Sequence, residues 1–212
     1  MSKFGNSEFP IKLTNDYNLD YINLYILLYK IANSAILKLR KVNCFNYMVT
    51  SKAKLNYSKV ADFFLAFANS KGDLLTNLKL QKLVYYAQAW YLANYKTPLF
   101  DDDFEAWIHG PVLRKLYTDL KNKGFYLSTP ISSDVRIKNV EKDLNNIDPK
   151  LFPFLEEVAK VYFPYTAYEL EFMTHQEDPW IKARGNLEPT DRCTNIITKP
   201  SMCEFYGKRI QN

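Results

Sequence analysis

The chain has 212 residues, of which 47% are hydrophobic and 24% charged, a balance that is ordinary for a globular protein and excludes an intrinsically disordered chain. Its net charge of +5 is modest, and Lys and Arg are interleaved with Asp and Glu, so the concentrated basic block typical of a nucleic-acid interface is absent. The three cysteines, Cys44, Cys193 and Cys203, have neither metal-site spacing nor the density of a disulfide scaffold, which favours a reduced, cytoplasmic protein.

The first part of the chain predicts an N-terminal helical extension. Residues 19–40 are rich in Leu, Ile and Tyr, but polar residues such as Asn23 and Lys30 interrupt them, so no run of about 18 apolar residues exists to span a membrane. A signal peptide is not visible either. We expect an amphipathic helix that docks on the main domain or on a partner.

The amino-acid composition of the sequence changes near Met48, after a segment rich in Asn, Tyr and Ile. One hypothesis is therefore that Met48 is the native start and that residues 1–47 are an optional extension. The domain proper is predicted over residues 55–210, which is long enough to bury a core and fold alone.

The centre of the predicted fold is a helix over residues 78–95. This stretch has no Gly or Pro and almost no β-branched residue, and apolar side chains cover most of its surface, so we expect it inside the domain. Thr76 is the expected N-cap. A preceding helix is predicted over residues 59–69, capped by Asn56 or Ser58.

A short alternating run over residues 104–108 predicts a strand, which the break at Gly110 and Pro111 closes. Because the first turn of a helix tolerates proline, a helix is predicted over residues 112–123.

Residues 125–147 show no sustained period, and we predict a loop with one short strand near residues 135–140. Three helices are expected after it, beginning at Pro149, Thr166 and Pro200. The predicted fold is mainly α, a compact helical domain around a buried central helix with a small β element.

Two blocks of sequence resemble one known family. The first is Lys79-Leu-Gln-Lys-Leu-Val-Tyr-Tyr-Ala-Gln-Ala-Trp, followed by Pro98-Leu-Phe-Asp and Glu105-Ala-Trp-Ile-His-Gly-Pro-Val. The second is Tyr168-Glu-Leu with Thr174-His-Gln-Glu-Asp-Pro-Trp. In this order they resemble the Panacea domain, the SocA-like antitoxin and GepA-like family. The motif residues, which we expect to be mainly structural, are Leu80, Gln81, Lys82, Leu83, Tyr85, Ala87, Gln88, Trp90, Glu105, Gly110, Pro111, Thr174, His175 and Pro179.

The resemblance implies an antitoxin that neutralises a toxin encoded by a neighbouring gene, usually by direct protein contact. Many such proteins lie on phages or other mobile elements. One branch, the SocA type, acts as an adaptor that delivers its toxin to the ClpXP protease. Direct neutralisation is our first expectation and proteolytic delivery the alternative.

Signatures of enzymes are absent from the sequence. It has no phosphate-binding loop, no Gly-rich dinucleotide fingerprint, no Gly-x-Ser-x-Gly elbow and no Cys-x-x-Cys pair. The acidic run Asp101-Asp102-Asp103 offers oxygen ligands, yet its spacing differs from an EF-hand loop, which favours a solvated turn over a metal site. We therefore predict no catalytic residue, no metal and no cofactor.

The chain has two histidines, His109 and His175, one in each block. Catalysis would require a partner such as Glu105 or Asp178 within hydrogen-bond reach. We favour a structural role, in which the ring of His175 satisfies carbonyls or pairs with an acid near a helix end while Trp180 packs underneath.

Aromatic and basic residues are the types that dominate binding energy at protein interfaces. The candidate partner-binding residues are Trp107, His109, Tyr86, Arg114 and Trp180. For each aromatic residue the alternative is core packing, which we favour at Trp90. Trp107 is the strongest candidate, since it alternates with the core-facing positions of the predicted strand.

Direct nucleic-acid binding is the alternative of another class. Several basic residues are placed to flank a groove, namely Lys79, Lys82, Arg114, Lys115, Lys121 and Lys123. Lys side chains on buried helices more often extend outward to stay solvated, so nucleic acid is the less favoured partner.

Overall fold

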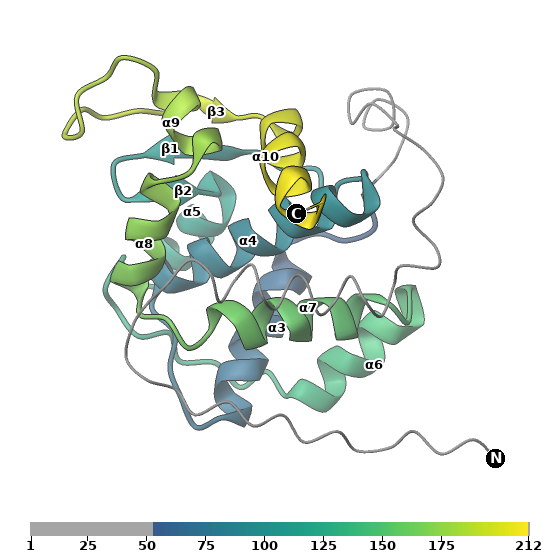
Figure 1. Cartoon of the computed structure of the whole chain (residues 1–212). Coiled ribbons are helices and arrows are strands. Elements are labelled where there is room, and N and C mark those ends of the chain that lie inside the picture. Colours follow the sequence, from purple (N-terminus) through teal and green to yellow (C-terminus); the bar gives the residue numbers. More distant parts are fainter. Residues whose placement is uncertain (1–52, 212) are drawn as a thin grey trace, which may run out of the picture.

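Helix α4 (Asn77–Tyr95) runs through the middle of the molecule, and the other elements pack around it (Figure 1). The computed structural model describes residues 53–211; the predicted extension over residues 1–47, with its helix at 19–40, lies outside them. Fifteen of the 19 residues of α4 are buried, which confirms the predicted central helix. The hydroxyl of Thr76 accepts a hydrogen bond from Lys79 N and caps its first turn as predicted.

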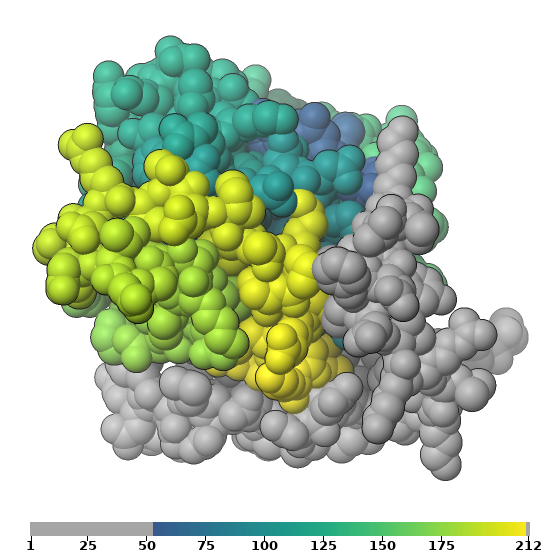
Figure 2. All heavy atoms as spheres, turned by 90° about the horizontal axis from the view of Figure 1, so that it is seen from above, coloured from purple at the N-terminus to yellow at the C-terminus, as the bar shows by residue number. Residues whose placement is uncertain are grey.

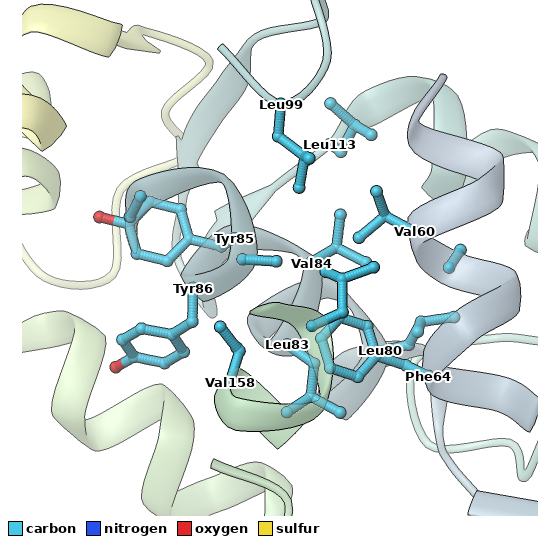
Figure 3. Packing of buried hydrophobic residues seen from close by; sticks show 14 of the residues in the cluster. Val60, Phe64, Leu80, Leu83, Val84, Tyr85, Tyr86, Leu99, Leu113 and Val158 are labelled. Carbon is cyan, nitrogen blue, oxygen red and sulfur yellow. The ribbon is translucent and has the colours of Figure 1, made fainter. Parts of the chain in front are cut away.

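Two helices, α3 (Tyr57–Ser70) and α7 (Leu151–Tyr162), pack on one side of α4. Helix α6 (Ile137–Ile147) packs against both of them. Asn56 caps α3, as one of the two predicted alternatives. Figure 3 shows Leu80, Leu83 and Val84 of α4 packed among side chains from α3 and α7, which together form the core.

A small antiparallel sheet lies on another side of α4. Strand β1 (Phe104–Trp107) pairs with β2 (Gly110–Val112) and with β3 (Ile196–Ile197), in the order β2-β1-β3. Strand β3 comes from the C-terminal part of the chain, and Figure 2 shows that part, in yellow and yellow-green, beside the teal residues that follow α4. We call residues 104–112 the hairpin.

The remaining helices lie around the hairpin and α4. They are α5 (Arg114–Asn122), α8 (Ala167–His175), α9 (Asp178–Arg184) and α10 (Lys199–Gln211). Thr166 and Glu169 form the predicted capping box at the start of α8. Within residues 53–211 the structure therefore has eight helices and three short strands, as expected for a mainly α fold.

Two local predictions were wrong. The helix predicted over residues 112–123 begins at Arg114, because Gly110 to Val112 pair with β1; Pro111 is tolerated there since β2 is an edge strand. The loop and strand predicted within residues 125–147 are replaced by α6, whose buried Val140 and Leu144 pack against α3 and α7. The helix depends on these tertiary contacts rather than on its own propensity.

Pro179 does separate α8 from the next segment, but it also occupies the first turn of α9, a helix that the sequence pattern did not indicate. None of the helices within residues 53–211 combines the length and the apolar character needed to cross a bilayer.

Candidate functional site

The inner side of the hairpin is fixed by buried side chains. Three donors bond its carbonyl oxygens: Trp180 Nε1 to Trp107 (3.0 Å), Arg184 Nη1 to Ala106 (3.3 Å) and Lys82 Nζ to Pro111 (3.1 Å). Each donor is buried. Because buried carbonyls need partners, these bonds hold the hairpin in one position against α4 and α9.

Two buried glutamines of α4 anchor the chain on both sides of the hairpin. Gln81 Oε1 accepts from Leu113 N at 2.8 Å, just after β2. Gln88 accepts from Leu99 N and donates to Phe100 O, ahead of β1. Gln81, Gln88 and Lys82, three of the motif residues of α4, therefore hold the hairpin and the chain on both sides of it.

Gly110 lies at the closest approach between the hairpin and these supports. Its φ is +86°, and a Cβ there would lie 2.7 Å from Thr174 Oγ1 and 2.9 Å from Lys82 Nζ. Only glycine fits both the backbone conformation and the space. Burial lowers the pKa of Lys82 from its ordinary value of 10.5 to about 7, against the opposing effect of Glu171.

The outer side of the hairpin carries a cluster of polar and aromatic side chains, Glu105, Trp107, Arg114 and Tyr117, which we call the outer cluster. Arg114 donates from Nε and Nη2 to the two oxygens of Glu105, both at 2.6 Å. Trp107 Nε1 donates to Glu105 Oε2 at 2.7 Å. The indole ring of Trp107 lies 5.5 Å from the guanidinium of Arg114 and 4.9 Å, edge to face, from the ring of Tyr117. These contacts fix each side chain of the cluster.

His109 extends the outer cluster at the tip of the hairpin. Its Nδ1 lies 3.0 Å from Glu171 Oε1 on α8, and the imidazole is exposed. The structure thus brings three of the predicted partner-binding residues, Trp107, His109 and Arg114, onto one exposed stretch of the hairpin and the start of α5.

The other two predicted contact residues are placed in the core. Tyr86 is fully buried and stacks on Tyr162, with ring centres 3.8 Å apart. Trp180 is also buried and stacks on the ring of His175 at 4.1 Å, in the arrangement that we expected for this pair. Neither Tyr86 nor Trp180 is available to a partner in this conformation, so we leave both out of the candidate site.

His175 differs from its expected role in one respect. Its Nε2 is buried and has no hydrogen-bond partner among the described residues, so the ring caps no helix carbonyl through this atom. Burial lowers the pKa of His175, which keeps the ring neutral against Trp180.

Sequence reasoning missed two buried groups next to the site. Glu177 accepts hydrogen bonds from Tyr206 and, at 3.5 Å, from Tyr86, and burial raises its pKa from 4.5 to about 7. Arg184 donates to four carbonyl oxygens and is almost fully buried. Glu177 lies inside the second motif block, so its position in the sequence could have identified it as a candidate. Arg184 lies outside both blocks, and the sequence contains no pattern that indicates its role.

The remaining charged groups that we considered are held by partners. Asp102 and Asp103 form ion pairs with Lys115 and Lys199, and the part of the chain that the structure describes contains no group of acidic, His and Cys side chains that could hold a metal ion. Lys79 donates to Phe163 O at 2.8 Å, and Lys82 is buried, so these two lysines do not line an open groove.

The part of the chain that forms the candidate site also resembles known proteins. Residues 80–181 match the family model described as "Antitoxin SocA-like, Panacea domain". Antitoxin SocA of Caulobacter vibrioides (strain NA1000 / CB15N) is 33% identical over 78 residues, which cover 36% of this chain and 42% of the relative. No solved structure matches the chain. The match confirms the family resemblance seen in the sequence, over a region that contains the hairpin, α5 and α8.

Proposed function

We propose that this chain, through the Panacea domain that its residues 80–181 match, is an antitoxin that binds a cognate toxin protein directly. We further propose that the outer cluster, together with His109, forms the centre of the contact surface. The observation that carries this proposal is a cluster of two half-buried aromatic rings and an exposed Arg, held by mutual contacts on the hairpin and α5, where buried motif residues support the hairpin. Trp, Tyr and Arg are the residues most enriched among interface hot spots.

Rigidity is the second argument for this surface. Trp107 is held by a hydrogen bond to Glu105, by the guanidinium of Arg114 and by the ring of Tyr117. A side chain that is already fixed loses little conformational entropy when a partner covers it, so more of the contact energy remains as affinity. A standard interface of roughly 1,200 to 2,000 Å² centred on Trp107 would cover the outer cluster and His109.

The experiment is co-expression of the full chain with each neighbouring open reading frame, scored first by cell growth and then by co-purification. One neighbour should be toxic alone, should be neutralised by the chain, and should co-purify with it. Trp107→Ala should abolish both effects. As a matched control, Ile147→Ala removes an exposed apolar side chain from α6, on the other side of α4 from the sheet (Figure 1), and should leave neutralisation intact.

Three results would contradict the proposal. If no neighbour is toxic, the antitoxin role fails. If Trp107→Ala neutralises as well as the wild type, the contact surface lies elsewhere. If neutralisation occurs without a stable complex and disappears in cells that lack ClpXP, the chain acts as a proteolytic adaptor instead.

A further inference from the structure

Two ion pairs and one His–Glu hydrogen bond around the hairpin share one orientation, with the basic side chain outside and the acid inside. The side-chain exposures are 54% for Arg114 and 11% for Glu105, 52% for His109 and 15% for Glu171, and 69% for Lys115 and 19% for Asp102. By contrast, pairs on other helices, such as Lys182 with Asp178 or Lys208 with Glu204, expose both partners to more than half. In these three pairs the basic side chain is therefore the more exposed partner, whereas the Lys199 and Asp103 pair just before β1 has the reverse orientation, with exposures of 17% and 49%.

We infer that the outer cluster and its neighbours His109 and Lys115 bind an acidic segment of a protein partner. This inference rests on the proposed function and names the chemistry of the toxin surface that the hairpin recognises. Carboxylates of the partner would pair with Arg114, His109 and Lys115, while an apolar side chain between them would cover the ring of Trp107.

The hydrogen-bond capacity of the cluster supports an incoming carboxylate. Glu105 already accepts three donors, two from Arg114 and one from Trp107, and is almost fully covered, so it repels an approaching anion only weakly. A guanidinium has five N–H groups, and Glu105 uses two of those on Arg114. The remaining N–H groups of Arg114 are therefore available to a second carboxylate.

The surrounding charges favour a short acidic segment over a nucleic acid. Asp101, Asp103 and Asp119 are exposed at the edges of the hairpin and on α5. A continuous phosphate backbone that crossed the outer cluster would pass near these carboxylates, and each would repel it. A protein segment needs only a few carboxylates at the positions of Arg114, Lys115 and the His109 ring, so the flanking acids instead restrict where it binds.

The test uses the purified full-length chain and three labelled probes of known composition: a peptide of ten glutamates, a peptide of ten glutamines and a 20-nucleotide single-stranded DNA. Fluorescence anisotropy measures binding as salt is raised. We expect the glutamate peptide to bind, to weaken with salt, and to bind at least tenfold more tightly than the glutamine peptide or the DNA.

The variants locate the binding surface. Arg114→Gln should weaken the glutamate peptide at least tenfold and Arg114→Lys should restore part of the affinity, because the charge returns without the bidentate geometry. Lys115→Gln removes a cation but leaves the Glu105 and Arg114 pair intact, so its loss of affinity cannot come from a disrupted hairpin. Lys160→Gln, on α7, removes a cation that is 49% exposed, against 69% for Lys115, and that lies far from the sheet, so it should change nothing.

The outcomes separate this inference from the proposed function. Absence of glutamate-peptide binding, an equal effect of Lys160→Gln and Lys115→Gln, or tighter binding of the DNA would each overturn the acidic-segment inference. Toxin neutralisation in the co-expression experiment can still stand in those cases. Conversely, localised binding of the glutamate peptide without any neutralised neighbour would support the inference and reject the antitoxin role.

Discussion

A pair of Trp and Arg side chains lies at each side of the hairpin, and the two pairs have different partners and different exposure. On the inner side the Arg184 guanidinium lies 5.0 Å from the ring of Trp180, and both side chains are buried. On the outer side Arg114 lies 5.5 Å from Trp107 and is exposed. The same two residue types thus act as support on one side and as a candidate contact surface on the other.

The partners of the two arginines explain the difference. Arg184 donates to four backbone carbonyls, one in β1 and three in the loop after α9, so its hydrogen bonds hold the chain itself together. Among the residues that the structure describes, Arg114 donates to a single carboxylate, that of Glu105, through two of its five N–H groups. Removing an inner residue should therefore cost stability, and removing an outer residue should cost binding. The predictions below test this contrast, ranked by their expected effect on the free energy of unfolding.

Arg184→Gln should have the largest effect. It removes the charged donor from four carbonyl oxygens, of which that of Ala106 belongs to a buried residue, and hydrogen bonds to charged groups contribute about 1.5 to 3 kcal/mol each. We expect a loss of about 3 kcal/mol or more in urea denaturation. A loss below about 1 kcal/mol would show that the loop after α9 does not depend on this side chain.

Gly110→Ala should destabilise by about 1 to 3 kcal/mol, because a residue with a Cβ is strained at positive φ and the added atom meets Thr174 and Lys82. Gly72 has a similar φ of +69° but open space around the position of a Cβ, so Gly72→Ala is the control for backbone strain alone. The excess cost at Gly110 measures the contact with the buried supports. Equal costs at the two positions would mean that the supports can move aside.

Lys82→Met should change how stability depends on pH. The pKa of Lys82 falls from 10.5 to about 7 in the folded protein, so between pH 7 and 10.5 the unfolded chain binds the proton that the folded chain has lost. The wild type should therefore gain stability as pH rises through this window, by up to about 1.4 kcal/mol per pH unit. The Met variant should lose this slope in denaturation curves at several pH values; an unchanged slope would contradict the buried amine.

Glu177→Gln should also change how stability depends on pH, but with the opposite sign to Lys82→Met and over a lower range of pH. Burial raises the pKa of Glu177 from 4.5 to about 7, so between these values the folded chain holds a proton that the unfolded chain has released. The contribution of Glu177 is present below pH 4.5 and is lost as pH rises to about 7. The Gln variant should be less sensitive to pH between 5 and 7 than the wild type, which thermal unfolding in matched buffers would measure.

Trp107→Ala should have the smallest effect on stability, about 1 kcal/mol or less, because the side chain is only partly buried. It is nevertheless the variant that should abolish toxin neutralisation. The melting temperature and the toxin neutralisation should be measured on the same variant. A large loss of stability would show that Trp107 supports the fold, as the buried residues on the inner side do, and would contradict its role as a contact residue.

The sequence predicted secondary structure best where interactions between residues close in the chain are enough to form it. Residues 78–95 are helix formers throughout, and Thr76 and Glu169 act through atoms within one helical turn. It failed at α6, whose two buried residues Val140 and Leu144 give a weak signal without the helices they pack against. It also missed β3, since two residues of strand are defined only by their pairing with β1.

For the candidate site, the sequence alone determined the residue types and the motif blocks, and these were enough to point to the hairpin and to Trp107, His109 and Arg114. Only the tertiary structure decided how far each aromatic residue is exposed, leaving Trp107 half-buried and placing Tyr86 and Trp180 in the core. The physical reason is that exposure, charge orientation and pKa are set by neighbours from distant parts of the chain. The same Trp and Arg types therefore support the fold in one environment and remain available to a partner in the other.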